Sequence, residues 1–211
     1  GLFRASVIDE SDVERLKKEI ENELGPVDGI VVNATPAQPL RPIEEYDWEF
    51  YQSMIDFFVK SPYLLTRAFL PHMRQQKWGR IINIASEVFT RGVAPFSAYV
   101  AAKGGQLGWT RSMANELAPD GIRVNMINAD AVFSEGDTTS GLWQEIGEDR
   151  ARSKGLDPTE LEEHYRKRNL LHTRISGADV GRAVVFFAAG GTPTTGATLP
   201  VDGGVAAAFP R

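Results

Sequence analysis

Short apolar runs alternate along the chain with longer segments in which apolar residues recur every three or four positions. The runs at 27–34 (VDGIVVNA), 79–86 (GRIINIAS) and 121–128 (GIRVNMIN) predict buried strands. Helices are expected at 11–24, 47–76, 97–117 and 176–187. Continuous apolar strands that alternate with helices predict a parallel sheet that helices cover on both faces.

Further short strands are expected at 2–8 and 197–201. The segment 133–175 is polar and charged, and it is expected to form an excursion from the core that contributes a substrate loop. The chain contains neither a repeat nor a low-complexity linker. We therefore predict one α/β domain over residues 1–211, a Rossmann-like doubly wound sheet.

Composition narrows the function classes. A net charge of -5 and a pI near 5.3 argue against a broad basic surface for nucleic acid. The chain has no cysteine, which excludes disulfides and thiolate metal sites, and its three histidines lack metal-ligand spacing, so no metal site is expected. No apolar run approaches the roughly 18 residues of a membrane span, and Gly1–Asp9 lacks the apolar core of a signal peptide. A cytoplasmic protein without a membrane partner is expected.

Tyr99 and Lys103 are the first candidates for chemistry. A spacing of four places both side chains on one helix face, where an ammonium can lower the pKa of a phenol. Taken alone, this spacing favours a solvated helix pair over a catalytic one. Ser86 favours the catalytic interpretation of this pair, because it ends the preceding strand at the sheet edge where open α/β folds bind ligands. Its hydroxyl can donate to a substrate oxygen and accept from a phenol.

The run Ile82–Ser86, followed thirteen residues later by Tyr99 and then by Lys103, resembles the active-site block of short-chain dehydrogenases/reductases. Further similarities, in the family's order, lie at Val32–Thr35 (its N-N-A-G motif), Gly121–Asn125 (G-I-R-V-N) and Val201–Gly204 (V-D-G-G). The resemblance implies an oxidoreductase that interconverts a small alcohol and its carbonyl compound with NAD or NADP.

The same resemblance implies a role for each site residue. Tyr99 is the expected general acid/base, Ser86 holds and polarises the substrate oxygen, and Lys103 lowers the pKa of Tyr99 and binds the nicotinamide ribose. Cofactor contacts are expected from Asn33, Ala34, Ile84, Tyr99, Lys103 and Val132. Hydride transfer belongs to the cofactor, while the protein supplies position and protonation.

The sequence departs from the family's pattern in three places. The family's glycine-rich cofactor loop and first two strands have no counterpart, so the functional polypeptide is expected to contain additional residues. Ala129-Asp130 replaces a P-G pair after the sixth strand of the family. Phe58 occupies the position of a fourth catalytic residue, an asparagine. Because Pro62 has no N–H to bond the Phe58 carbonyl, we expect a kink there and a water that relays protons from Lys103.

Three segments narrow the subfamily. Asp130–Val132, Leu161–Arg166 and the C-terminal run Ala207–Arg211 resemble the dehydrogenase part of bacterial rhamnulose-phosphate aldolase/alcohol dehydrogenase fusions. That similarity implies a polyol, sugar or hydroxyaldehyde substrate. Basic residues of the excursion, among them Arg150, Lys154 and Arg168, fit either an anionic substrate or, as the favoured reading, a solvated face among acidic neighbours.

Two other functions stay open at this stage. A degenerate Rossmann-like binding or scaffold subunit fits the absent cofactor loop, but it has no need of Ser86, Tyr99 and Lys103 together. A lyase that resembles halohydrin dehalogenases fits the fold, although those enzymes carry arginine where this chain has Lys103. A homodimer or homotetramer is expected, because the helices at 47–76 and 97–117 carry more apolar positions than one core-facing stripe requires.

Overall fold

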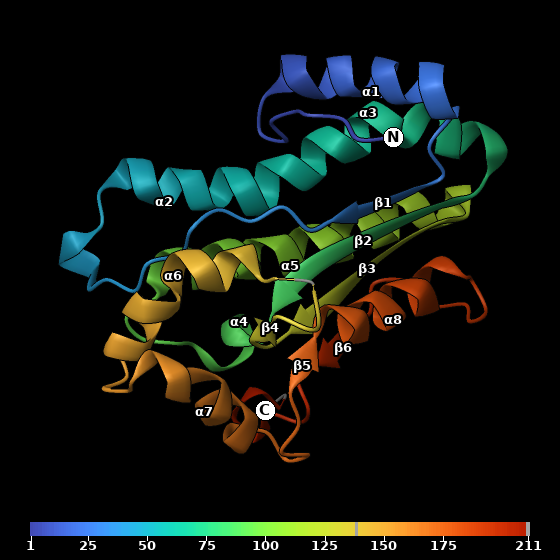
Figure 1. Ribbon diagram of the computed structural model, residues 1–211. Coiled ribbons are helices and arrows are strands. Elements are labelled where there is room, and N and C mark those ends of the chain that lie inside the picture. The colour runs from blue at the N-terminus through green and yellow to red at the C-terminus, as the bar shows by residue number, and fades with distance from the viewer. Residues whose placement is uncertain (138, 210–211) are drawn as a thin grey trace.

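The structure is a computed structural model that describes residues 1–137 and 139–209 (Figure 1). Pro210 and Arg211, the last two residues of the C-terminal run noted above, lie outside the described residues. Within the described part, none of the helices has the length and apolar content that crossing a bilayer requires.

A parallel sheet forms the centre of the fold. Its strands are β1 (Gly29–Val32), β2 (Gly79–Ser86), β3 (Ile122–Ala129) and β6 (Thr198–Val201), in the order β1-β2-β3-β6. The register pairs Ser86 with Ala129 and Ala129 with Val201, so these strands end together at one edge. The prediction of a parallel α/β sheet is confirmed.

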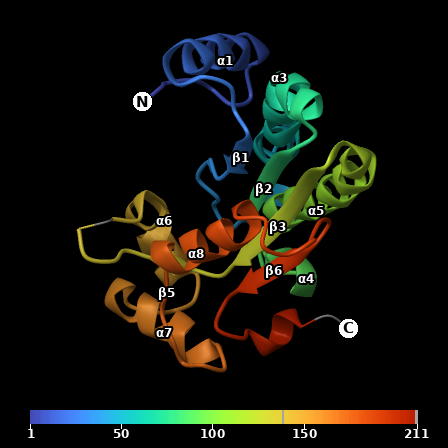
Figure 2. The same ribbon diagram turned by 90° about the vertical axis from the view of Figure 1, so that its right-hand side faces the viewer.

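Helices cover both faces of this sheet (Figure 2). On one face, α3 (Ser61–Gln76) and α5 (Ser97–Leu117) pack on inward-facing residues such as Ile81 and Val124. On the other face, α8 (Gly177–Ala188) packs through Ala183 and Phe187 on Ile82 and Ile127. The two faces take alternate residues of each strand, as the pleat requires. The predicted boundaries of β2 and α5 are confirmed.

Residues 2–8 do not form the expected strand. Among the described residues no strand lies beside them, and an extended segment without a ladder partner is not a strand. The Ser6 amide donates instead to the Asp12 carboxylate at 2.8 Å. Asp9 then caps α1 (Glu10–Leu24) by accepting from the Asp12 amide at 2.9 Å, so the helix begins before the expected Ser11. The helix α1 packs against α3.

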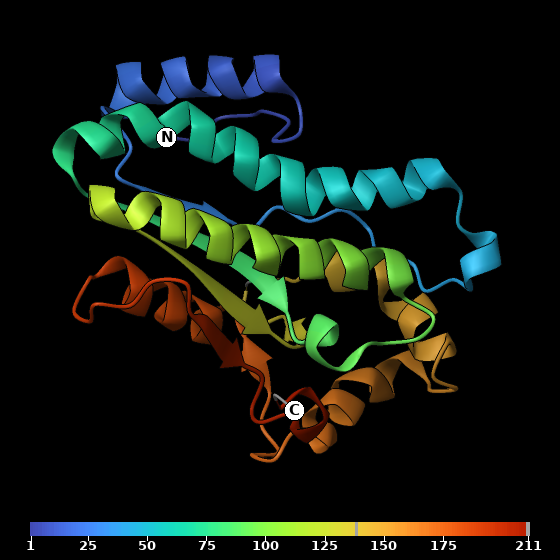
Figure 3. The ribbon, with the colours of Figure 1, turned by 180° about the vertical axis from the view of Figure 1, so that it is seen from behind.

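The long helix expected over 47–76 is interrupted, as predicted. It divides into α2 (Trp48–Ile55), a π-helical turn at Asp56–Lys60 and α3. The Ser61 amide donates to the carbonyl of Asp56 five residues earlier, and the Ser61 hydroxyl donates to the Phe57 carbonyl at 2.6 Å. The irregular turn therefore lies just before Pro62, whose missing N–H is tolerated at the start of α3. Figure 3 shows α2 and α3 running end to end beside α5.

The segment 133–175 leaves the core at the carboxyl edge of the sheet. It contains the helices α6 (Gly141–Arg152) and α7 (Leu161–Arg168). The short strands β4 (Val132–Phe133) and β5 (Ile175–Ser176) lie at its two ends. The strands β4 and β5 pair in parallel and close its two ends together. Ala151, Leu161 and Tyr165 form a small core of its own, against which Phe133 and Trp143 pack. A short helix, α4 (Val88–Arg91), follows β2 on the same side.

Candidate active site

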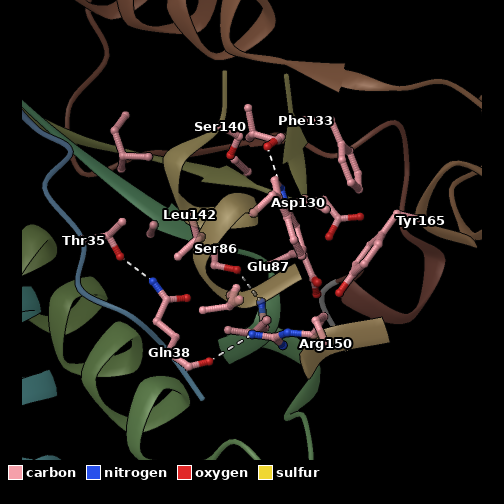
Figure 4. A pocket seen from close by; sticks show the side chains of 18 of the residues that line it. Thr35, Gln38, Ser86, Glu87, Asp130, Phe133, Ser140, Leu142, Arg150 and Tyr165 are labelled. Atoms are coloured by element: carbon pink, nitrogen blue, oxygen red, sulfur yellow. Dashed lines mark hydrogen bonds between the residues drawn. The ribbon is translucent and has the colours of Figure 1, made fainter. Parts of the chain in front are cut away.

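A cavity of about 890 Å³ lies between the carboxyl ends of the strands and the excursion (Figure 4). Its walls come from the ends of β1, β2 and β3, from the start of α5, and from α6 and α7. Ser86, Tyr99 and Lys103 all line it. The three residues that the sequence singled out for proton transfer therefore share one cavity at the edge where open parallel sheets bind ligands.

Tyr99 lies in the first turn of α5 and is buried between aromatic rings. Its ring stacks on Phe96 with 4.7 Å between centroids and meets the edge of Phe58 at 5.2 Å. Burial raises the pKa of the Tyr99 phenol above its ordinary value, while hydrogen bonding to Ser86 and the positive charge of Arg150 oppose this rise. The phenol is therefore protonated at neutral pH.

Lys103 is buried one turn further along α5. Its Nζ donates to the Ile84 carbonyl at 2.8 Å and to the Gln106 side-chain oxygen at 3.1 Å. The same Nζ lies 3.8 Å from the centroid of the Phe58 ring, a cation–π contact. Burial lowers the pKa of Lys103 well below its ordinary value.

The role of Lys103 in lowering the pKa of Tyr99 stays a prediction. In this arrangement burial has the largest effect on the pKa of the phenol, and the positive charge of Arg150 opposes it. The Lys103 Nζ is held by Ile84 and Gln106 and lies over the Phe58 ring. At the Phe58 position the side chain contributes a ring face to Lys103 in place of an amide.

Most of the expected cofactor contacts also line the cavity. Asn33 follows β1, Ile84 lies in β2, and Val132 begins β4. Ala34 is exposed and does not belong to the cavity wall. The described residues contain no group of three histidine, aspartate or glutamate side chains arranged for a metal ion.

The sequence did not single out an ionic network that fixes the excursion to the strand ends. Arg168 of α7 binds Asp130, which follows β3, and its Nη2 donates to Glu87 Oε1 at 3.0 Å. Arg91 of α4 holds both Glu87 oxygens, at 2.5 and 3.0 Å. Glu87 directly follows Ser86, and Asp130 stands where the P-G pair was expected. Their positions were visible in the sequence, but their partners were not.

Arg150 of α6 is the second group that the structure adds to the site. Its Nη2 donates to the Gln38 carbonyl at 3.2 Å, and its guanidinium carbon lies 4.7 Å from the Phe96 ring centroid (Figure 4). The favoured expectation of a solvated face holds for Arg152, whose side chain is 75% exposed and pairs with Asp149. It fails for Arg150, because α6 turns that position into the cavity.

Comparison with known proteins gives a family match over nearly the whole chain. The family model described as enoyl-(acyl carrier protein) reductase matches residues 2–206. The oxidoreductase YuxG of Bacillus subtilis is 32% identical over 210 residues, which cover 99% of this chain and 30% of YuxG. The L-fucose dehydrogenase of Oryctolagus cuniculus is 30% identical, over 96% of this chain and 67% of that enzyme.

A solved structure gives the corresponding match in fold. Sorbitol-6-phosphate 2-dehydrogenase SrlD of Erwinia amylovora superimposes with a TM-score of 0.83 at 26% identity. The superposition covers 96% of this chain and 77% of that structure.

Proposed function

The chain belongs to the short-chain dehydrogenase/reductase family of oxidoreductases, and from this premise we propose that it interconverts a small alcohol and its carbonyl compound with NAD or NADP. The proposed substrate is a polyol, a sugar or a hydroxyaldehyde. The observation that carries the proposal is the meeting of Ser86, Tyr99 and Lys103 in one cavity at the strand ends. The similarity to L-fucose dehydrogenase and to sorbitol-6-phosphate 2-dehydrogenase supports a hydroxyl-rich substrate.

In this proposal Tyr99 moves the proton and Ser86 holds the substrate oxygen. A buried phenol with a raised pKa stays protonated, and that form donates a proton to a carbonyl oxygen during reduction. The Ser86 hydroxyl donates a second hydrogen bond to the same oxygen. In the direction of alcohol oxidation the phenol must first lose its proton, which Arg150 and Ser86 favour and burial opposes.

The cavity fits a nicotinamide cofactor in size and in lining. Its volume of about 890 Å³ is within the 300–1,000 Å³ typical of cofactor and ligand sites. Asn33, Ile84, Val132 and Lys103 are the residues of the cavity wall that would hold the cofactor, with Ala34 contributing backbone at the end of β1. When bound, the cofactor supplies or accepts the hydride.

Phe58 belongs to the proton relay in this proposal. A water on its carbonyl oxygen passes protons between Lys103 and solvent, and the π-helical turn with Pro62 supports this, because Pro62 has no N–H to donate. A high-resolution crystal structure of the natural full-length protein tests the relay. A dry space between that carbonyl and Lys103 contradicts it.

The excursion at 133–175 serves as the substrate loop in this proposal, because α6 and α7 form one wall of the cavity. We also propose that the chain corresponds to the dehydrogenase part of aldolase/dehydrogenase fusions. The match to YuxG is consistent with it, since YuxG extends far beyond the part that this chain covers. The protein is further proposed to be a homodimer or homotetramer, supported by the exposed side chain of Trp48 on α2.

The decisive experiment replaces Tyr99 by phenylalanine in the natural full-length protein. Dehydrogenase activity on L-fucose, sorbitol and 1,2-propanediol is followed through the absorbance of the reduced cofactor. Tyr99→Phe is expected to lower kcat by about 10²- to 10⁴-fold, because a positioned acid/base is worth that factor. Its affinity for the reduced cofactor, measured by fluorescence, stays near that of the wild type, because the phenol is not needed to hold the dinucleotide.

Tyr63→Phe provides the matched control, since the Tyr63 phenol lies exposed on α3, away from the cavity. This variant is expected to keep wild-type turnover. Retention of more than about a tenth of the turnover in Tyr99→Phe excludes Tyr99 as the acid/base. A wild-type protein that binds no dinucleotide contradicts the proposed function as a whole.

A further inference from the structure

The cavity is positively charged although the chain is acidic overall. Its basic lining residues are Arg91, Lys103, Arg150, Lys154 and Arg168, and its acidic ones are Glu87, Asp130 and Glu135. In a formal count the lining therefore carries an excess of two positive charges, whereas the whole chain has a formal net charge of -5. A cavity of opposite sign to the surrounding protein concentrates anions.

Two of these cations are neutralised where they lie. Arg91 binds Glu87, and Arg168 bridges Glu87 and Asp130. Lys103 is buried against a backbone carbonyl and an amide oxygen. These three groups are held by protein partners, whereas Arg150 and Lys154 have no acidic partner among the described residues.

Arg150 has donors to spare. Among the described residues it forms no ion pair, and its one hydrogen bond goes to the Gln38 carbonyl. A guanidinium carries five N–H donors in a planar fork, so four of them have no acceptor in the described part of the protein. Lys154 likewise forms no ion pair in the described part of the chain, and its Nζ lies 5.6 Å from the centroid of the Tyr165 ring in the cavity wall.

The position of Arg150 ties it to the reacting end of the cavity. Its guanidinium and the Tyr99 ring both contact Phe96, each at 4.7 Å from the centre of that ring. Its charge also acts on the Tyr99 phenol. An anion bound to Arg150 is therefore close enough to Tyr99 to belong to the molecule whose hydroxyl or carbonyl reacts there.

We propose that Arg150, assisted by Lys154, binds a carboxylate or phosphate group of the substrate. The inference rests on the proposed interconversion of an alcohol and its carbonyl compound, and it adds that the substrate carries a carboxylate or phosphate group. The planar fork suits both anions, since it donates two parallel hydrogen bonds to a pair of oxygens. Stacking on Phe96 and the bond to Gln38 hold the fork in place.

The test compares matched anionic and neutral substrates in the natural full-length protein. One pair is 3-hydroxybutyrate and 2-butanol, and the other is sorbitol 6-phosphate and sorbitol. Wild-type kcat/KM is expected to favour the anionic member of one pair by at least about tenfold, and the preferred pair identifies carboxylate or phosphate as the anion. Arg150→Met is expected to lower kcat/KM for that anion by roughly 10- to 150-fold, the worth of a charged hydrogen bond.

If Arg150 has only a structural role, the Arg150→Met variant gives a different result in this assay. Loss of packing lowers activity on both members of a pair, whereas loss of the anion site leaves the neutral member within about threefold of the wild type. Arg152→Met is the matched control on the same helix, because Arg152 is exposed and paired with Asp149. It is expected to leave both substrates unchanged.

Three results overturn the inference. The first is a wild type that prefers the neutral member of both pairs. The second is an equal loss of kcat/KM on both members in Arg150→Met, and the third is a lower affinity of this variant for NADPH, which means that Arg150 binds a phosphate of the cofactor and not the substrate. If the wild type oxidises none of these compounds, the proposed function is decided separately, by dinucleotide binding and by activity on L-fucose and 1,2-propanediol. Calorimetry with inorganic phosphate and with 3-hydroxybutyrate then decides the anion site alone. Binding by the wild type that is lost in Arg150→Met supports the site, and absence of binding by the wild type refutes it.

Discussion

Arg168 connects the excursion to the two acidic side chains that follow β2 and β3. Its guanidinium binds Asp130 and Glu87, whose side chains are 5% and 2% exposed. Arg168→Met keeps much of the apolar length of the side chain but removes this charge. Glu87 retains both bonds from Arg91, whereas Asp130 loses its ion-pair partner. The stranded group is therefore the Asp130 carboxylate.

Breaking a buried ion pair on one side costs about 3–5 kcal/mol. The loss does not reach the upper end of this range, because Asp130 can take up a proton instead of remaining charged. Burial raises the pKa of Asp130 already in the wild type, and each pH unit above that raised pKa adds about 1.4 kcal/mol to the cost of the proton in the variant. At about pH 7 the loss of stability is therefore expected near 3 kcal/mol, and at about pH 5 it is expected to be smaller.

The sign of this pH dependence follows from burial. Burial already raises the pKa of Asp130, and Arg168 is the group that opposes the rise. Without Arg168 the native state holds the Asp130 proton more tightly than the unfolded chain does. The free energy of unfolding of the variant, relative to the wild type, then falls as the pH rises from about 4 to 7.

Urea unfolding of wild type and variant at about pH 5 and pH 7 measures the loss. Hydrogen exchange over 161–176 shows whether α7 opens locally before the whole domain unfolds. Adding Asp130→Asn to Arg168→Met is expected to recover about half of the loss at pH 7, because the stranded charge is removed. Arg182→Met, which removes the exposed partner of Asp179, is expected to change stability by less than about 0.5 kcal/mol.

Two results refute this reasoning. The first is a loss below about 1 kcal/mol at pH 7 with unchanged exchange in α7, which means that the network contributes little. The second is a loss that is equal at both pH values, which means that no stranded carboxylate causes it.

The remaining predictions concern Lys103 and the assembly. Burial lowers the pKa of Lys103 below its ordinary value of 10.5, so the unfolded chain holds this proton more tightly and wild-type stability rises with pH up to about 10.5. Lys103→Met removes this dependence, and the stability of the wild type relative to the variant is expected to increase between about pH 7 and pH 9.5 in urea unfolding. A constant difference contradicts the lowered pKa of Lys103. The proposed oligomer predicts the mass of a dimer or a tetramer in light scattering at micromolar concentration, and a monodisperse monomer contradicts it.

Local sequence patterns were sufficient to predict the core of the fold. Apolar runs located β2 and β3, because a strand buried on both faces has few polar positions. The spacing of Tyr99 and Lys103 located one face of α5, and the order of strand and helix brought Ser86 to the same cavity. Each of these inferences depends on residues close together in the sequence or on a regular parallel topology.

The tertiary structure decided which charges meet. Gln38 and Arg150 are 112 residues apart, and Glu87 and Arg168 are 81 residues apart, so no local pattern joins either pair. Arg150 and Arg152 look alike in the sequence, yet the rotation of α6 turns one into the cavity and the other toward solvent. The sequence alone thus determined the sheet, most of its helices and the placement of Ser86, Tyr99 and Lys103 at one cavity, because backbone hydrogen bonding and burial follow local periodicity. The partners of buried charges depend on contacts between distant segments, and only the packed structure determines them.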